Sequence, residues 1–207
     1  MKGAIFDLDG VIVDTAKYHY LAWREIAKEL GFDFKKSDNE RLKGVSRMAS
    51  LEILLEVGGI KGLTEEQKFA IAEKKNNLYV KMLSSLNESE LLPGAKEYLV
   101  KLKNSGVKVA LGSASKNAPY ILKMLNISDL FDAVVDGNSV SKAKPDPEVF
   151  LKAAELLGLK AGECCVFEDS KAGIDAALKG GFIVVAVDKF GVLYGAKRKV
   201  KCLGDLL

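Results

Sequence analysis

The sequence predicts an α/β fold whose core is a parallel sheet, with an all-helical region inserted after the first strand. Three observations support this prediction. The apolar run Ala4 to Phe6 opens the chain as a strand, residues 14–90 carry helical patterns without a convincing strand, and strands alternate with helices from residue 91 onward. Such alternation is typical of right-handed parallel βαβ units. We therefore expect a Rossmann-like core domain formed by 1–13 and 91–207, and a helical cap domain formed by 14–90.

The composition is that of a globular protein with a substantial core. The chain has 207 residues, 48% of them hydrophobic, and a formal net charge of +3. This charge is too small to indicate nucleic-acid binding. The three cysteines have neither disulfide nor metal-site spacing, and the chain shows no signal peptide and no apolar run of membrane-spanning length. We expect a cytoplasmic protein, a monomer by default, that binds neither nucleic acid nor membranes.

The first predicted strand ends in two carboxylates. Asp7 and Asp9 follow Ala4 to Phe6, and Gly10 comes next. Side chains two residues apart lie on the same side of an extended chain, and ligands of parallel α/β sheets bind beyond the carboxyl ends of the strands. Two neighbouring carboxylates are unfavourable unless a cation or a shared proton stabilises them. A Mg²⁺ site that leaves one carboxylate for chemistry meets this condition, and an acidic turn is the alternative.

Three helices are expected in the inserted region. Thr15, with the aspartate before it, can cap a first helix that ends before Gly31. Ser46 is the expected cap of a second helix, which ends at a pair of glycines. Thr64 and Gln67 form a capping box at the start of a third helix.

The rest of the chain is expected to supply four further strands and the helices between them. The expected strands span 107–111, 133–135, 164–167 and 182–187, and the expected helices begin after Pro93, near Tyr120, at Asp146–Pro147 and at Ala172. Beyond Val187 the chain looks short for a final strand and helix. The sheet is therefore expected to have an abbreviated edge.

Polar residues follow the later strands, at the sheet edge where the first strand places its carboxylates. They are Ser113, the run Ser115–Lys116–Asn117, Lys144 and the pair Glu168–Asp169. Ser113 offers a hydroxyl to a phosphate oxygen, although a helix cap or turn explains it equally well. Lys144 lies in a proline-stiffened loop, where it can neutralise a phosphate. Asp169 with Asp7 offers the hard oxygen ligands that Mg²⁺ prefers.

These residues resemble the four motifs of the haloacid dehalogenase superfamily of phosphoryl-transfer enzymes. The motifs are Asp7-Leu8-Asp9-Gly10-Val11, Ser113, Lys144-Pro145 and Glu168-Asp169. The resemblance implies that Asp7 forms an aspartyl phosphate and that Asp9 is the general acid and base. It also implies that Ser113 and Lys144 hold the phosphoryl group. The implied ligands of Mg²⁺ are Asp7, the Asp9 carbonyl, Asp169 and, directly or through water, Glu168.

The inserted region resembles that of the β-phosphoglucomutase family within this superfamily. The resemblance rests on residues 14–19, Trp23, residues 42–47, Lys75–Asn76 and residues 113–117. It implies a mutase that interconverts β-D-glucose 1-phosphate and glucose 6-phosphate through an aspartyl-phosphate enzyme and a hexose bisphosphate. The implied substrate-binding residues are Thr15, His19, Lys43, Gly44, Arg47, Lys75, Ser115, Lys116 and Asn117.

Several of these residues can also be explained without a ligand. A bisphosphate needs a second anion site, and Arg47 can bind it bidentately. Lys75 interrupts an apolar stripe at helical spacing, so its side chain either snorkels to solvent or enters the cleft between the two parts. His19, the only histidine, is on its own more typical of a packed or half-exposed side chain. Thr15 can be a helix cap, and Trp23 is assigned to the core of the inserted region.

Two other functions remain open at this point. A Mg²⁺-dependent sugar-phosphate phosphatase shares the same core, but it needs no second anion clamp of the kind that Arg47, Lys116 and Asn117 offer. A non-catalytic sugar-phosphate-binding or receiver-like protein does not need Asp9. Dehalogenase chemistry is disfavoured, because the dehalogenases of the superfamily lack a carboxylate at this position. For the mutase we expect hinges near 13–16 and 85–92 that close the cleft to water.

Overall fold

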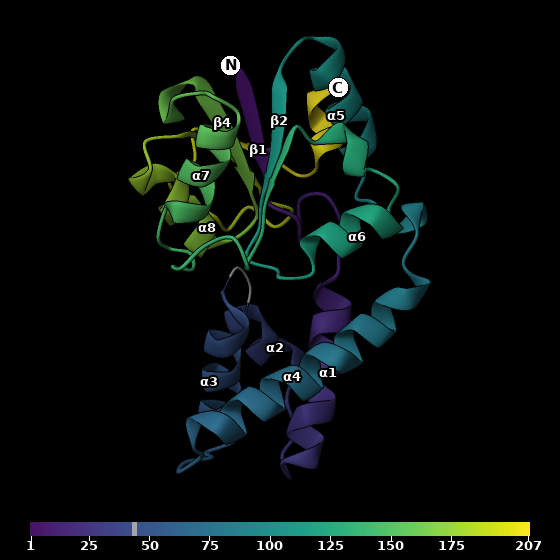
Figure 1. Ribbon diagram of the computed structural model, residues 1–207, viewed down its shortest axis with the longest axis vertical. Helices are drawn as coiled ribbons and strands as arrows, with labels where there is room; N and C mark the ends of the chain where they lie inside the picture. Colours follow the sequence, from purple (N-terminus) through teal and green to yellow (C-terminus); the bar gives the residue numbers. More distant parts are fainter. Residues whose placement is uncertain (43–44) are drawn as a thin grey trace.

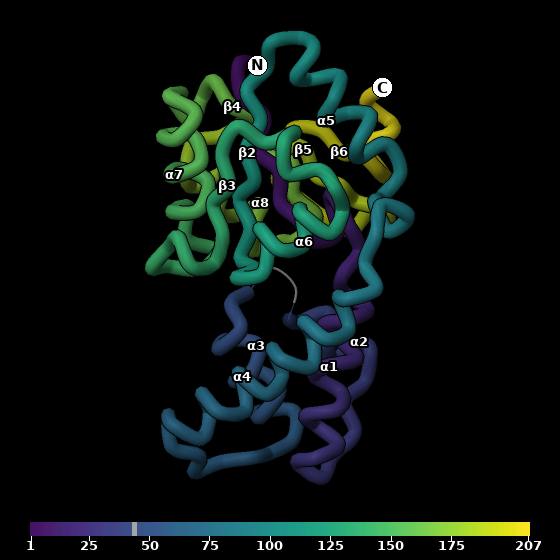
Figure 2. The backbone as a smooth tube through the Cα atoms, turned by 45° about the vertical axis from the view of Figure 1, so that its right-hand side comes forward, coloured from purple at the N-terminus to yellow at the C-terminus, as the bar shows by residue number. Residues whose placement is uncertain are grey.

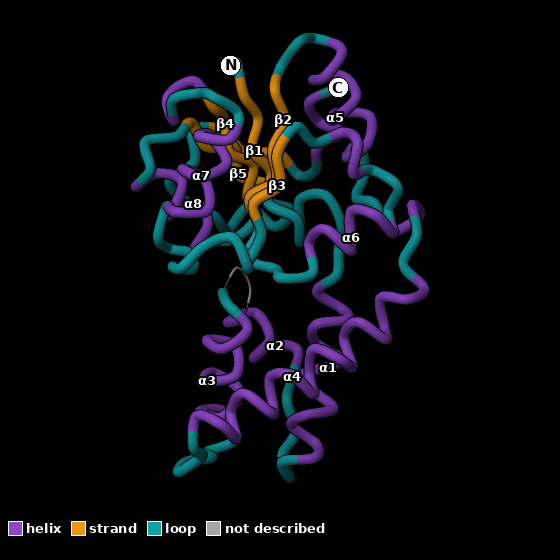
Figure 3. Tube along the Cα trace, in the orientation of Figure 1, coloured by secondary structure: helices purple, strands orange, loops and turns teal. Residues whose placement is uncertain are grey.

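The computed structural model describes residues 1–42 and 45–207. Its core is a six-stranded parallel sheet in the order β3-β2-β1-β4-β5-β6, which forms the upper half of the molecule in Figure 1 and is drawn in orange in Figure 3. The strands are β1 Gly3–Phe6, β2 Lys108–Gly112, β3 Ala133–Val135, β4 Cys164–Glu168, β5 Ile183–Val187 and β6 Arg198–Val200. Because the first strand lies in the middle, its carboxyl end has a neighbour on each side.

Helices cover both faces of this sheet (Figure 1). They are α5 Ala95–Asn104 and α6 Ala118–Met124 on one face, and α7 Glu148–Leu156 and α8 Lys171–Lys179 on the other. Successive residues of β1 point to opposite faces, so Phe6 packs in the cluster with α5 and α6 while Ile5 packs with α7 and α8. The Phe6 ring stacks on Phe167 of β4 with ring centroids 4.5 Å apart. Burial on both faces explains why the strands read as apolar runs.

The inserted region is a separate helical layer below the carboxyl ends of the strands (Figures 1 and 2). Its helices are α1 Ala16–Glu29, α2 Lys36–Asn39, α3 Arg47–Val57 and α4 Glu65–Met82. They surround an apolar cluster that includes Trp23, Phe34 and Leu51, all almost fully buried. In the described part of the chain, every helix is too short or too polar to span a lipid bilayer.

Two neighbouring segments connect the helical layer to the sheet. Val13 forms a bridge with Leu91, and the Leu92 backbone N–H donates to the Ile12 carbonyl at 2.9 Å. The entry and exit of the inserted region are therefore tied to each other. The domain boundaries that we expect, 1–13 with 91–207 and 14–90, stay a prediction.

The predicted fold class is confirmed, and the local start signals act largely as expected. The Ser46 hydroxyl accepts from the Ala49 N–H, and the capping box of Thr64 and Gln67 is present. The strand β6 is not expected from the sequence, because its residues Arg198–Val200 lack an apolar pattern. This three-residue strand is followed by a single 3₁₀ turn, Leu203–Leu206, so the expected abbreviation of this edge is confirmed. Charged residues on such an edge also oppose pairing with other chains.

Candidate active site

The parallel sheet brings chain-distant polar residues to one edge. Asp7 follows β1, Ser113 follows β2 and Asp169 follows β4, and these three strands are neighbours. The Ser113 side chain is buried, and its hydroxyl oxygen accepts from the Ser115 N–H at 3.1 Å. The turn role that the sequence left open is therefore present, and it places this hydroxyl on the same edge as the carboxylates.

Lys144 links the carboxylates of two strands. Its Nζ atom donates to Asp7 Oδ1 at 2.5 Å and to Glu168 Oε2 at 2.9 Å, and all three side chains are buried. Burial alone lowers the pKa of a lysine, but the two carboxylates outweigh it together and raise the pKa of Lys144 above its ordinary value. This lysine is therefore charged at neutral pH and holds Asp7 in place.

Glu168 is held by Ser170, which is not among the site residues expected from the sequence. The Ser170 hydroxyl donates to Glu168 Oε1 at 2.7 Å, and the Ser170 backbone N–H donates to the same oxygen at 3.0 Å. A Cβ atom on Gly173 would lie 2.0 Å from the Glu168 carboxyl carbon, so only glycine fits there. The signal for Ser170 is its position as the N-cap of α8 directly after the acidic pair.

Three carboxylates could hold a divalent cation. Within the described residues, Asp7, Glu168 and Asp169 each offer an oxygen, and these oxygens lie within 4.8 Å of one another. Oxygen donors suit Mg²⁺, and three carboxylates beside one lysine leave negative charge for a cation to balance. Burial is the main cause that raises the pKa of Asp7 to about 6, so the carboxylate is costly to ionise without such a charge. These residues fit a divalent metal.

Gly10 allows the acidic residues to approach so closely. Its backbone φ is +80°, and a Cβ atom would lie 2.0 Å from Asp169 Oδ2. L-amino acids with side chains rarely adopt this φ. A glycine is therefore required at position 10, because Asp169 occupies the space that a side chain would need.

Asp9 has a different environment from the three clustered carboxylates. Its Oδ1 accepts a hydrogen bond from the Thr15 hydroxyl, which in turn accepts from the Tyr79 hydroxyl at 3.1 Å. Burial, followed by the charges of Asp7 and Asp14, raises the pKa of Asp9 to about 8. The capping role that the sequence left open for Thr15 is absent, since its side chain makes no cap hydrogen bond and Asp14 accepts from the Ala16 N–H instead.

Lys75 is buried rather than snorkelling, which excludes one of its two sequence-based explanations. Only 2% of the residue is exposed, and its Nζ lies 2.7 Å from His19 Nδ1. The same atom lies 4.9 Å from the Trp23 ring centre and 4.7 Å from that of Tyr79. Burial and the charge of Arg47 lower the pKa of Lys75 to about 7, against the opposing effect of Asp9. Burial and both cations lower the pKa of His19 well below its usual value.

A second polar cluster joins the inserted region to the core. Arg47 Nη2 donates to Asn76 Oδ1 at 2.8 Å, and Asn117 Nδ2 donates to the same oxygen at 2.9 Å. Arg47 Nη1 also contacts Glu73 Oε1 at 2.6 Å. Ser115 accepts from the Asn117 N–H at 3.3 Å, and Lys116 beside it is exposed. Lys43 and Gly44, which we expect to bind substrate, lie outside the described residues.

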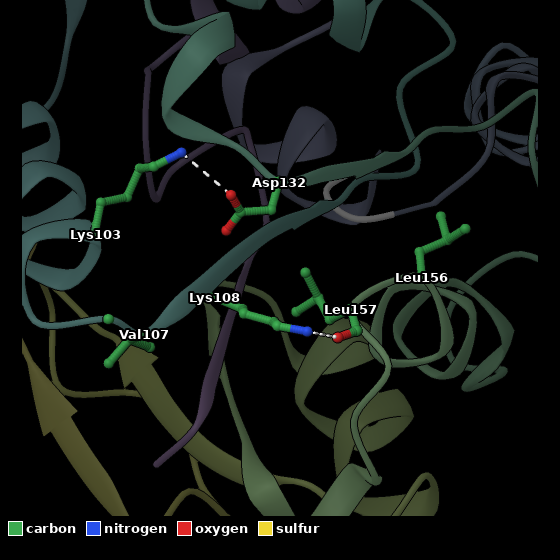
Figure 4. Close-up of a pocket in the computed structure, with 7 residues that line it drawn as sticks. Lys103, Val107, Lys108, Asp132, Leu156 and Leu157 are labelled. Atoms are coloured by element: carbon green, nitrogen blue, oxygen red, sulfur yellow. Dashed lines mark hydrogen bonds and ion pairs between the residues drawn. The ribbon is translucent and has the colours of Figure 1, made fainter.

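A hollow of about 330 Å³ lies elsewhere on the core (Figure 4). Lys108, which begins β2, lines it, so it is at the opposite end of the strand from Ser113. Its polar groups are already paired: Lys108 donates to the Leu157 carbonyl at 2.6 Å, and Lys103 lies 3.2 Å from Asp132. Among the described residues, no predicted site residue lines this hollow.

Phosphoryl transfer is the chemistry that the strand-end site suits, because this reaction depends mainly on a positioned nucleophile and on charge neutralisation. Comparison with known proteins agrees with this class. A family model described as haloacid dehalogenase-like hydrolase matches residues 1–181. The chain therefore belongs to the haloacid dehalogenase-like hydrolases.

Individual relatives narrow the similarity further. Over its whole length the chain is 44% identical to a β-phosphoglucomutase of Bacillus subtilis (strain 168), of which it covers 92%. The crystal structure of a β-phosphoglucomutase from Clostridium difficile is 42% identical with a TM-score of 0.96, over 100% of this chain and 93% of that one. A phosphorylated-carbohydrate phosphatase of Thermotoga maritima is 33% identical over 87% of this chain and 82% of its own length.

These similarities confirm three expectations from the sequence. The resemblance to the superfamily and to the β-phosphoglucomutases is confirmed, and the protein is an enzyme of the phosphoryl-transfer type. Its relatives imply a divalent metal, in agreement with the cluster of Asp7, Glu168 and Asp169. The phosphatase is the less similar relative in this comparison.

Proposed function

We propose that this protein interconverts β-D-glucose 1-phosphate and glucose 6-phosphate as a β-phosphoglucomutase-type enzyme. The observation that carries the proposal is the second polar cluster, where Arg47 of the inserted region and Asn117 of the core meet at one oxygen. An enzyme that only hydrolyses a monophosphate needs no such cluster. A hexose bisphosphate needs two anion sites, because each phosphate must be held during transfer.

Asp7 is the proposed nucleophile and Asp9 the general acid and base. An Asp7 oxygen attacks phosphorus, the bond from phosphorus to the sugar oxygen breaks, and Asp9 gives its proton to that oxygen. In the reverse direction a sugar hydroxyl gives its proton to Asp9 and attacks the phosphorus of the aspartyl phosphate. Phosphorylated Asp7 thus converts glucose 1-phosphate into the bisphosphate, and transfer from position 1 back to Asp7 leaves glucose 6-phosphate. The hydrogen bond from Thr15 keeps Asp9 oriented for both proton transfers.

Lys144 and Ser113 hold the transferring phosphoryl group in this proposal. Lys144 already contacts the nucleophile, so its charge lies where negative charge must be balanced. Mg²⁺ is the proposed cofactor, held by the side chains of Asp7, Asp169 and Glu168 and by the Asp9 carbonyl. When bound, Mg²⁺ supplies positive charge to the phosphoryl oxygens.

The inserted region binds the sugar, and residues of both parts hold its second phosphate. Arg47, Ser115, Lys116 and Asn117 hold the distal phosphate, and Lys75 with His19 and Thr15 faces the acid–base residue. Lys43 and Gly44 are proposed to contact sugar hydroxyls. Closure about 13–16 and 85–92 excludes water while Asp7 is phosphorylated, which favours transfer to sugar over hydrolysis.

The test compares two products from one substrate. The enzyme is incubated with Mg²⁺, β-glucose 1-phosphate and a trace of glucose 1,6-bisphosphate, and glucose 6-phosphate and inorganic phosphate are measured together. We expect glucose 6-phosphate to form much faster than phosphate. Phosphate release that exceeds glucose 6-phosphate formation refutes the mutase and favours the phosphatase, and near-wild-type turnover of Asp9→Asn refutes the proposed acid–base role.

A Mg²⁺-dependent sugar-phosphate phosphatase is the second candidate, because the Thermotoga maritima relative that is named a phosphorylated-carbohydrate phosphatase is 33% identical over 87% of this chain. Water then takes the phosphoryl group from Asp7 in place of a sugar hydroxyl. We keep the monomeric state and the cytoplasmic location as predictions, which size-exclusion chromatography and cell fractionation test directly.

A further inference from the structure

Glu73 forms an ion pair with the guanidinium of Arg47, the group to which the proposed function assigns the distal phosphate. Its Oε1 lies 2.6 Å from Arg47 Nη1. The second nitrogen of the same guanidinium donates to Asn76 Oδ1. Both acceptors come from α4, where positions three residues apart lie on one face of the helix. Two nitrogens of Arg47 are therefore satisfied by oxygens of this chain.

The arrangement imitates the way an arginine binds an anion. Arg47 directs two N–H groups at two oxygens, as it does with a carboxylate or a phosphate. Asn117, the core residue on the other side of the cluster, donates to one of these oxygens as well. A phosphate that takes the same N–H groups of Arg47 and Asn117 displaces both acceptors, and of the two acceptors only Glu73 carries a charge of the same sign as the phosphate.

Packing does not explain why an acidic residue is present at this position. The Glu73 side chain is 63% exposed, whereas Arg47 is 18% exposed. The contact with Arg47 is thus an interaction of an exposed acid with a largely covered base.

We propose that Glu73 is an internal competitor for the distal phosphate and thereby sets the affinity of this site. The inference rests on the proposed function, since it takes Arg47 as the residue that holds this phosphate. With no phosphate bound, the Glu73 carboxylate satisfies Arg47. When the distal phosphate binds, it replaces the carboxylate, and the exposed Glu73 side chain turns to solvent.

The expected effect is small but measurable. Exposed ion pairs contribute little to stability, so removing the charge of Glu73 lowers the dissociation constant for the distal phosphate by about two- to five-fold. The effect also falls as salt concentration rises, because salt screens exposed charges. Turnover of a small monophosphate such as acetyl phosphate, which brings no second phosphate, depends on Asp7 and not on this competition.

The experiment measures binding of glucose 1,6-bisphosphate by calorimetry with Mg²⁺ present, in an Asp7→Asn background that cannot be phosphorylated. Glu73→Gln is compared with Glu56→Gln, which removes the acid of a second arginine–glutamate pair, Arg41 with Glu56 at 2.8 Å. We expect tighter binding for Glu73→Gln alone. We also expect Glu73→Gln to have no effect once Arg47→Ala is present, since a general charge effect would persist there.

Each outcome decides between the two proposals. Unchanged or weaker binding by Glu73→Gln overturns the inference, and so does an equal effect of Glu56→Gln. If glucose 6-phosphate forms from glucose 1-phosphate while Glu73→Gln is neutral, the inference alone fails. If the bisphosphate binds more tightly to Glu73→Gln but no isomerisation occurs, the proposed mutase fails and the competition stands. If the bisphosphate does not bind at all, both fail.

Discussion

Replacing Lys75 with methionine is expected to make the protein more stable and the enzyme less active. The ammonium group is buried beside His19, which offers a nitrogen but no opposite charge. The pKa of Lys75 falls from 10.5 to about 7. Each unit of pKa corresponds to ~1.4 kcal/mol, so keeping this lysine charged in the folded state costs up to about 5 kcal/mol. The rings of Trp23 and Tyr79 offset about 1–2 kcal/mol of this through cation–π contacts.

Methionine fits the same space without a charge. It is unbranched, like lysine, and its sulfur makes favourable contacts with aromatic rings. We expect Lys75→Met to raise the free energy of unfolding by about 2 kcal/mol at pH 7, and the melting temperature by roughly 4–8 °C for a chain of this size. Turnover of glucose 1-phosphate should fall, because the proposed contact with the substrate is lost. Such an exchange of stability for activity is common at functional sites.

The pH dependence gives the sharper test. Unfolded, Lys75 keeps its proton up to about pH 10.5, whereas the folded protein releases it near pH 7. Between these values the unfolded state binds more protons, so wild-type stability rises with pH, by about 2 kcal/mol from pH 7 to pH 9. Lys75→Met lacks this contribution. The advantage of the variant over the wild type should therefore narrow toward pH 9.

Lys74→Met is the matched control on the same helix. Lys74 is 57% exposed and pairs with Glu29 at 2.6 Å, so its replacement should change stability by less than about 0.5 kcal/mol at either pH. Thermal and urea unfolding at pH 7 and pH 9 measure all three proteins. A Lys75→Met protein that melts at or below the wild-type temperature at pH 7, or a difference that does not narrow by pH 9, refutes the reasoning.

Three further predictions concern the strand-end site. Gly10→Ala should lower turnover at least tenfold, and it should lower the free energy of unfolding more than Gly31→Ala does. Both glycines have a positive φ, but only Gly10 lies against Asp169. Equal losses of unfolding free energy in urea would contradict this prediction. Ser170→Ala should lower the free energy of unfolding by about 2–3 kcal/mol, more than the ~1 kcal/mol of a helix cap alone, because it also removes the hydroxyl that donates to the buried Glu168. Thr64→Ala, which removes only a cap, is the control in the same unfolding assay. Mg²⁺ should raise the melting temperature of the wild type, and a chelator should abolish its turnover. The melting temperature of Asp169→Asn, measured by calorimetry, should change little with Mg²⁺. An equal rise in both proteins would exclude the proposed ligand set.

Most of the fold could be predicted because its local signals agree with its tertiary arrangement. Ala133–Val135 is a strand with the bounds that the apolar pattern indicates, and the capping residues of α3 and α4 act as their types suggest. The strand β6 could not be predicted, because it forms by pairing with β5 and not from an apolar pattern of its own. Its only strongly buried residue is Val200, whose carbonyl accepts from the Asp188 N–H at 2.7 Å.

The site could be predicted in its composition but not in its pairings. Parallel strands place their carboxyl ends together, so the convergence of Asp7 and Glu168 follows from the strand order alone. The partner of Thr15 depends on how α1 and α4 approach β1, and no local pattern separates its bond to Asp9 from a helix cap. The same is true of Lys75, whose contact with His19 joins two helices far apart in the sequence.

The bridge between Val13 and Leu91 limits how the two parts of the molecule can move. A helical layer attached by one segment could twist about it, but here the outgoing and returning segments are bonded side by side. A twist of the layer about either segment alone would therefore have to break that bridge.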